Sequence, residues 1–198
     1  MQLLIDRGAD VNAECNLYGG GNTTMGLLVT SIHPVRAGLR RRLVEILLNA
    51  GATGADSIAG AASLGRLDLV QRFSPTRDEM QAAFRAACEY GRTAVAEFLL
   101  ERGVEIGAQD GNGMTGLHVA AMGPYLDTVK MLLSRKAPLE PKNVWGGSVL
   151  GGTLWASVHY DPNADYAPIV EALLRAGAHV EPYFQERINE IRRRHEKR

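Results

Sequence analysis

Residues 113–121 read Gly113-Met114-Thr115-Gly116-Leu117-His118-Val119-Ala120-Ala121. The end of this stretch is small and apolar, so we expect a short helix whose alanines let a second helix approach closely. Further along, Val129, Leu132 and Leu133 recur at the i, i+3, i+4 spacing that gives a helix one apolar face. The sequence therefore predicts two short helices packed against each other.

The second helix of this pair belongs to a series of apolar runs that recurs along the chain. Each run precedes Gly-Ala or a near variant, at residues 8–9, 51–52, 103–104, 136–137 and 177–178. Position 136 follows position 103 by 33 residues, and position 177 follows 136 by 41. A glycine can end a helix in the left-handed conformation without a Cβ clash. Such self-similarity is typical of repeat proteins.

These features resemble the ankyrin repeat family, and in particular a bacterial type of ankyrin repeat protein. Residues 113–121 look like the family's G-x-T-P-L-H-x-A-A opening, with Gly116 in place of the proline. The likeness extends over roughly residues 1–181. It implies an all-α solenoid of antiparallel helix pairs joined by finger loops, with about five repeats and a C-terminal helix.

The predicted repeat domain, residues 1–181, divides into unequal units. They are a half repeat (1–13), a repeat with an insertion near 32–39 (16–53), a shortened repeat (54–75), two near-standard repeats (76–108 and 109–142) and a repeat with an insertion near 160–166 (143–181). Residues 182–198 are predicted to form a C-terminal capping helix that covers the last apolar face. Because the chain opens in mid-repeat, we expect either an N-terminally truncated array or a half-cap formed by residues 1–13.

Composition narrows the function. The chain has 198 residues, of which 45% are apolar, and its 22 basic and 22 acidic side chains balance. That balance argues against a dedicated nucleic-acid binder, which needs excess positive charge. No apolar run is long enough to span a bilayer, and the first residues lack the features of a signal peptide. Two cysteines, Cys15 and Cys88, favour free thiols in a reducing cytoplasm.

Several residues could be taken for catalytic or metal-binding groups, but each of them has a simpler structural explanation. With Thr115 three residues earlier at a helix start, His118 is expected to have a structural role; the ankyrin resemblance implies that this histidine helps tie neighbouring turns by hydrogen bonds. The loop 161–165 alternates oxygen donors as a calcium loop does, but Tyr166 stands where glycine is needed. Gly19–Gly21 lacks the Lys-Ser/Thr of a phosphate-binding loop. We therefore expect no catalytic residue, no metal site and no cofactor.

The predicted function is a non-catalytic protein-protein interaction module that binds another protein through its concave finger and first-helix surface. Carried over from the family by position, that surface comprises Tyr18, Asn22, Glu89, Tyr90, Asp110, Asn112, Met114, Met122 and Trp145. Trp155 occupies about the place that His118 fills in its own repeat, so it is expected either in the core, which we favour, or lining the groove. No nucleic acid and no membrane are expected as partners, whereas a homodimer through the uncapped N-terminal face is.

Two other functions stay open. The first is a hydrolase of the glycosidase or esterase type, in which groove carboxylates converge; its candidates are Asp10, Glu89, Asp110, Glu140 and Asp161. Two facing carboxylates in one pocket would favour it. The second is a structural spacer of a larger multidomain protein, suggested by the mid-repeat start.

Overall fold

The protein is a row of short antiparallel helix pairs. The computed structural model describes residues 1–15, 22–30, 39–52 and 57–198. In these ranges the pairs are α2 (Thr24–Thr30) with α4 (Arg40–Asn49), α5 (Ile58–Leu64) with α6 (Leu67–Val70), α7 (Arg77–Glu89) with α8 (Thr93–Glu101), α9 (Gly116–Met122) with α10 (Leu126–Ser134), and α11 (Val149–His159) with α12 (Ala167–Arg175). Helix α1 (Gln2–Asp6) precedes them, and η2 (Pro182–Phe184) and α13 (Gln185–His195) follow.

The expected all-α architecture is confirmed, with one small addition. Strand β1 (Glu14–Cys15) pairs antiparallel with β2 (Asn22–Thr23), so that Glu14 lies opposite Thr23. A ladder of two residues per strand cannot organise a core, and it was not predicted. The helices alone therefore carry the fold in the described part of the chain.

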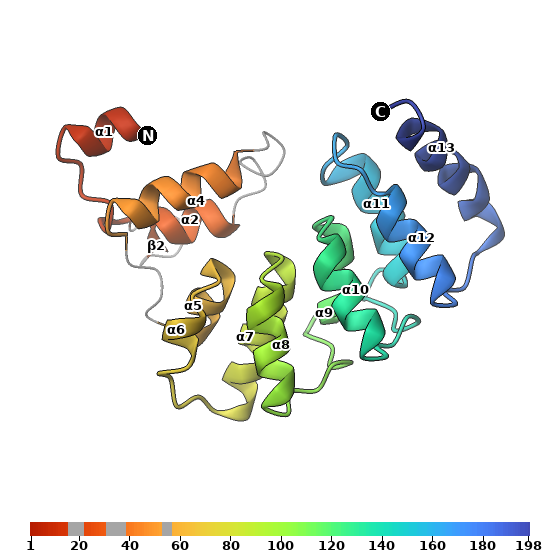
Figure 1. Cartoon of the computed structure of the whole chain (residues 1–198), viewed down its shortest axis with the longest axis horizontal. Coiled ribbons are helices and arrows are strands. Elements are labelled where there is room, and N and C mark those ends of the chain that lie inside the picture. The colour runs from red at the N-terminus through yellow and green to blue at the C-terminus, as the bar shows by residue number, and fades with distance from the viewer. Residues whose placement is uncertain (16–21, 31–38, 53–56) are drawn as a thin grey trace.

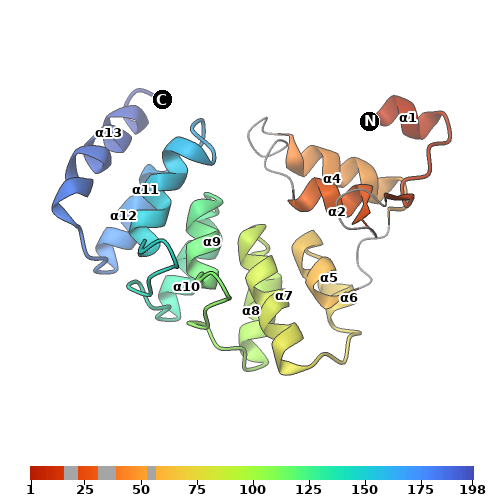
Figure 2. The same cartoon turned by 180° about the vertical axis from the view of Figure 1, so that it is seen from behind.

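The stack bends into an arc (Figure 1). From α5 to α12, the turns inside each helix pair lie along the inner side of the arc, and the loops between pairs lie along its outer side. The first helices α7, α9 and α11 face the viewer in Figure 2, and the second helices α8, α10 and α12 face the viewer in Figure 1. The molecule therefore presents a first-helix face and a second-helix face.

Helix ends follow the expected signals. Gly103 and Gly177 end their helices with φ angles of 86° and 95°, in the left-handed region that glycine adopts freely. Lys136 takes the equivalent place after α10 with a φ of 61°, which costs a side-chain-bearing residue some strain. The glycine-closed helix ends predicted from the repeats are thus present, and the helix end without glycine adopts the same conformation.

Helix α7 begins at Arg77, at the start of the repeat expected over residues 76–108. Its start is a capping box, in which the Thr76 hydroxyl accepts the amide of Glu79 and the Glu79 carboxylate accepts the amide of Thr76. The preceding α6 has only four residues. The added turns of α7 therefore stand where a full finger would lie.

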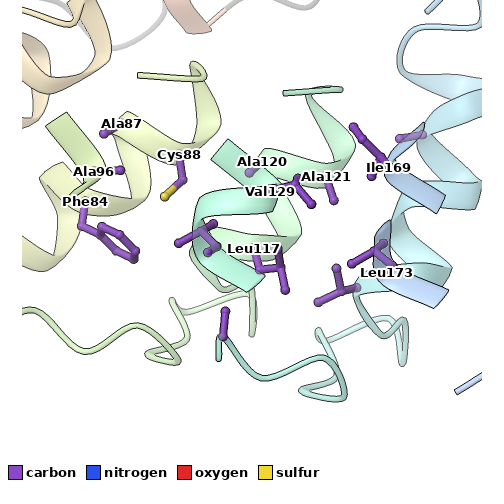
Figure 3. Close-up of a cluster of buried hydrophobic side chains, with 14 of the residues drawn as sticks. Phe84, Ala87, Cys88, Ala96, Leu117, Ala120, Ala121, Val129, Ile169 and Leu173 are labelled. Atoms are coloured by element: carbon purple, nitrogen blue, oxygen red, sulfur yellow. The ribbon is translucent and has the colours of Figure 1, made fainter. Parts of the chain in front are cut away.

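Two apolar clusters form the interior. The larger runs continuously from Ile58 to Ile191; Figure 3 shows its middle, where Phe84, Leu117 and Leu173 lie among alanines of the first helices. The smaller lies between α2 and α4 and joins residues Met25, Leu28, Val44, Leu47 and Leu64. Small side chains of the first helices, among them Ala83, Ala87, Ala120 and Ala121, are fully buried in this core, where they allow close packing.

Helix α13 lies against α12 at the C-terminal end of the arc. Ile188 and Ile191 are buried, and Phe184 packs on the main core. The guanidinium of Arg187 donates to the Ser157 hydroxyl at 3.2 Å. Helix α13 thus covers the outer side of the last helix pair. At the other end α1 has no buried residue, and Leu3 and Leu4 are exposed.

Candidate functional site

Two neighbouring fingers are built by the same side-chain device. The Oδ1 atom of Asp110 accepts the amides of Asn112, at 2.9 Å, and Met114, at 2.8 Å. The Oδ1 atom of Asn143 accepts the amides two and four residues later, those of Trp145 at 3.1 Å and Gly147 at 2.9 Å. Asn112 and Trp145 therefore occupy equivalent places at the tips of adjacent fingers.

The two fingers are also tied to each other. The amide of Val144 donates to the carbonyl of Asn112 at 2.9 Å. The side-chain amide of Gln109 donates to the carbonyls of Gly113 and Lys142, at 2.8 and 3.0 Å. Backbone held by its own turn and by its neighbour loses little entropy when a partner binds. On this support Trp145 is 76% exposed.

Two of the predicted contact residues build the finger instead of offering surface. Met114 is buried, with 8% of its surface exposed, and its sulfur lies 3.6 Å from the Asn143 side-chain nitrogen. Asp110 has one carboxylate oxygen engaged by backbone amides and the other 3.4 Å from the Arg85 guanidinium. The outward surface of this finger pair is thus carried by Asn112, Val144 and Trp145.

The remaining described candidates lie at the other end of the first helices. Glu89 and Tyr90 end α7, Met122 ends α9, and all three are half-buried. Helix α9 has seven residues, so about 10 Å separates its finger end from Met122. The predicted residues therefore form two groups on the first-helix face (Figure 2), one at the fingers and one at the turns inside the pairs.

Two predicted residues cannot be placed as contacts. Tyr18 lies outside the described residues. Asn22 is described through its backbone alone, where it pairs with Cys15 in the short ladder.

The prediction that Trp155 is a core residue is wrong. Ser148 caps α11 and accepts the amide of Gly151, so Gly151 holds the place of His118. Trp155 then corresponds to Met122, seven residues after its cap. It is 52% exposed, and its ring lies 5.1 Å from the ring of His159. Counting from the helix cap would have identified Trp155 as a surface residue of the first-helix face.

His118 serves the start of α9. Its Nδ1 accepts the amide of Thr115 at 3.2 Å, and the Thr115 hydroxyl accepts the amide of His118, which makes a capping box. Nε2 is buried and makes no hydrogen bond within the described residues. Burial lowers the pKa of His118, against a smaller opposite effect from the backbone of Gly147. The imidazole is therefore held neutral and inside.

Three carboxylates of the hydrolase hypothesis accept backbone amides, two from their own turns and one from the next finger. Asp10 accepts the amide of Asn12, Asp161 that of Asn163, and Glu140 that of His179, at 2.9, 3.2 and 2.9 Å. A plain Asx turn thus replaces the calcium loop considered at residues 161–165. No cluster of metal-ligating side chains occurs among the described residues.

Three carboxylates outside this candidate set have lowered pKa values. Side-chain hydrogen bonds from Arg66 and Arg187 lower the pKa of Asp68 and Glu190, and the backbone of Thr76 lowers that of Glu79.

No helix in the described ranges is long and apolar enough to cross a membrane.

Short antiparallel helix pairs, stacked through small first-helix residues and joined by locked fingers, define a helical-repeat solenoid protein. Residues 84–133 match the family model for ankyrin repeats (many copies). Residues 84–133 are therefore ankyrin repeats, as the sequence indicated. Ankyrin repeats are generally protein-protein interaction modules.

A curated relative covers part of the same chain. Serine/threonine-protein kinase 12 of Arabidopsis thaliana is 36% identical over 73 residues, which is 37% of this chain and 15% of the kinase. The match thus spans a small part of that relative's length.

Proposed function

We propose that this chain is a non-catalytic module that binds another protein through the tips of its fingers and the exposed ends of its first helices. The observation that carries the proposal is Trp145, 76% exposed on a finger whose backbone is fixed from both sides. Tryptophan is enriched at the energetic centres of protein interfaces because it buries a large area at low entropic cost. A rigid exposed tryptophan is suited to that role.

Trp155 extends the proposed surface across the last helix pair. It is 52% exposed on α11, and Val158, one turn on, is 42% exposed. Both tryptophans of the chain thus lie in residues 143–181, on one finger and its first helix. We place the centre of binding here and the edge near Glu89 and Tyr90.

The proposal also covers the cellular compartment, the chemical class of the partner and self-association of the chain. Two cysteines in 198 residues support a cytoplasmic location. The balanced charge supports a protein partner in place of nucleic acid. Exposed Leu3 and Leu4 of α1 support self-association through residues 1–13.

The test compares the partner affinity of two variants, each of which loses one exposed apolar side chain, one on the finger surface and one outside it. Proteins captured from native lysate by the wild type are identified, and the affinity for the strongest is measured by calorimetry. Trp145→Ala should weaken that affinity at least about tenfold, because hot-spot truncation typically costs more than 1.4 kcal/mol. Leu39→Ala, which removes an exposed side chain just before α4, should leave it unchanged. Equal affinity of wild type and Trp145→Ala would mean that the finger surface is not the binding site.

A further inference from the structure

Three helices enclose a groove on the second-helix face. Helix α12 forms its floor, α10 one wall and α13 the other (Figure 1). The floor consists of small or apolar side chains, including Ala167, Pro168 and Ala172, and Leu126 begins the α10 wall. This α12 groove has a volume of about 430 Å³ and runs along one side of a nine-residue helix. It is therefore long enough for a short peptide segment.

Positively charged side chains surround this floor. Lys130 projects from α10, Arg175 from the last turn of α12, and Arg192 from α13. The opposing carboxylates are Glu171 and Glu196. Arg192 already donates to Glu171 at 2.6 Å, which leaves Lys130 and Arg175 against one carboxylate. Neither Lys130 nor Arg175 forms an ion pair with another described residue.

The α13 wall is held in place by contacts at its C-terminal end. His195 Nδ1 lies 2.6 Å from Asp165 Oδ2, and the Arg198 guanidinium donates to the carbonyl of Asn163 at 2.6 Å. Buried Ile188 and Ile191 anchor the same helix. The groove is therefore a preformed feature, which lowers the entropic cost of binding.

We propose that the α12 groove binds an acidic amphipathic segment of a partner protein. Apolar side chains of the segment would lie on the floor formed by Ala167, Pro168 and Ala172, and its carboxylates would pair with Lys130 and Arg175. This is the helix-in-groove mode of recognition, here with charge complementarity at the rim. The second-helix face would then bind independently of the finger surface.

The probe is a fluorescein-labelled helical peptide with leucines on one face and glutamates along its flanks. Fluorescence anisotropy at low salt should show binding to the wild type. The Lys130→Glu/Arg175→Glu variant should bind at least about tenfold more weakly, because two attractive contacts become repulsive. The control, Arg7→Glu/Arg72→Glu, makes the same change in net charge outside the groove and should bind as the wild type does.

Further arms decide between this proposal and the alternatives. The same peptide with lysines in place of glutamates should bind at least about tenfold more weakly than the glutamate probe. The neutral variant Lys130→Gln/Arg175→Gln, checked by circular dichroism, separates lost attraction from lost folding. Absent binding, equal binding of the two probes, or an equal loss in the control variant would overturn the proposal. An oligonucleotide that displaces the probe at lower concentration than unlabelled peptide would also overturn it, in favour of a nucleic-acid partner.

Discussion

At the residue scale, the histidine that most invites a catalytic interpretation, His118, is a buried structural residue. His118 and Thr115 exchange hydrogen bonds at the start of α9, and the ring is enclosed between that start and the following finger. A histidine in this position acts through packing and hydrogen bonding, since it reaches no solvent and no reacting group. The protonation of His118 is nevertheless coupled to folding, because its pKa differs between the folded and the unfolded chain.

We predict that His118 makes the array less stable in mild acid. Its pKa lies below the ordinary 6.5 because burial disfavours the charged form. The unfolded chain therefore binds the proton more readily than the folded one, so the contribution is complete above pH 6.5 and is lost as the pH falls through the folded-state value. Urea unfolding from neutral to mildly acid pH should show the free energy of unfolding declining more steeply for the wild type than for His118→Gln. Parallel declines would contradict the assignment.

At the element scale, the turn between paired helices leaves no room for an added methyl group. Gly91 has a φ of 67°, and a Cβ built there would lie 2.4 Å from the Tyr125 ring of the next repeat. Gly103 has a φ of 86°, and nothing lies within 4 Å of its Cβ position. The two glycines thus share a backbone conformation and differ in their surroundings.

This difference gives a matched pair of substitutions. Gly103→Ala should cost about 1–2 kcal/mol of stability, from the left-handed conformation alone. Gly91→Ala should cost about 1–3 kcal/mol more, because the methyl group overlaps the ring. Urea denaturation measures both. In a Tyr125→Ala background the two costs should converge; if they stay apart, the ring is not the cause.

The sequence predicted these elements unevenly. Apolar runs followed by glycine located the second helices, because that pattern follows directly from helix periodicity and C-terminal geometry. The repeat expected over 76–108 begins at the cap of α7, and Thr76 and Glu79 carry the capping-box signal that would have given the exact helix start. Trp155 was misplaced because its slot was aligned with that of His118 and was not counted from the Ser148 cap. The α12 groove could not be predicted, since it depends on the angle at which α13 docks.

At the scale of the whole molecule, the two apolar clusters divide the array. Leu64 of α5 is the one member of the smaller cluster that comes from residues 57–198. In repeat proteins each unit is stabilised by its neighbours, so a weak junction lets one part open before the other. The α2–α4 pair is the expected place for such opening.

Leu47, 1% exposed, tests this division. Leu47→Ala should destabilise the smaller cluster by about 2–5 kcal/mol. Both tryptophans lie in residues 143–181, so their fluorescence reports on the larger cluster alone, whereas far-ultraviolet circular dichroism reports on all helices. In urea the dichroism should gain an early transition, and the fluorescence midpoint should stay constant. A fluorescence midpoint that falls in step would show a single cooperative unit.

In the two fingers, the residue that fixes the loop conformation is not the residue that is exposed at the tip. Asp110 and Asn143 arrange the same pair of amides, yet one tip carries asparagine and the other tryptophan. The side chain at the tip can therefore be exchanged while the main-chain path stays as it is. The binding specificity of this protein could therefore be changed by substitutions at positions 112 and 145, while residues 110 and 143 are kept to hold the loops.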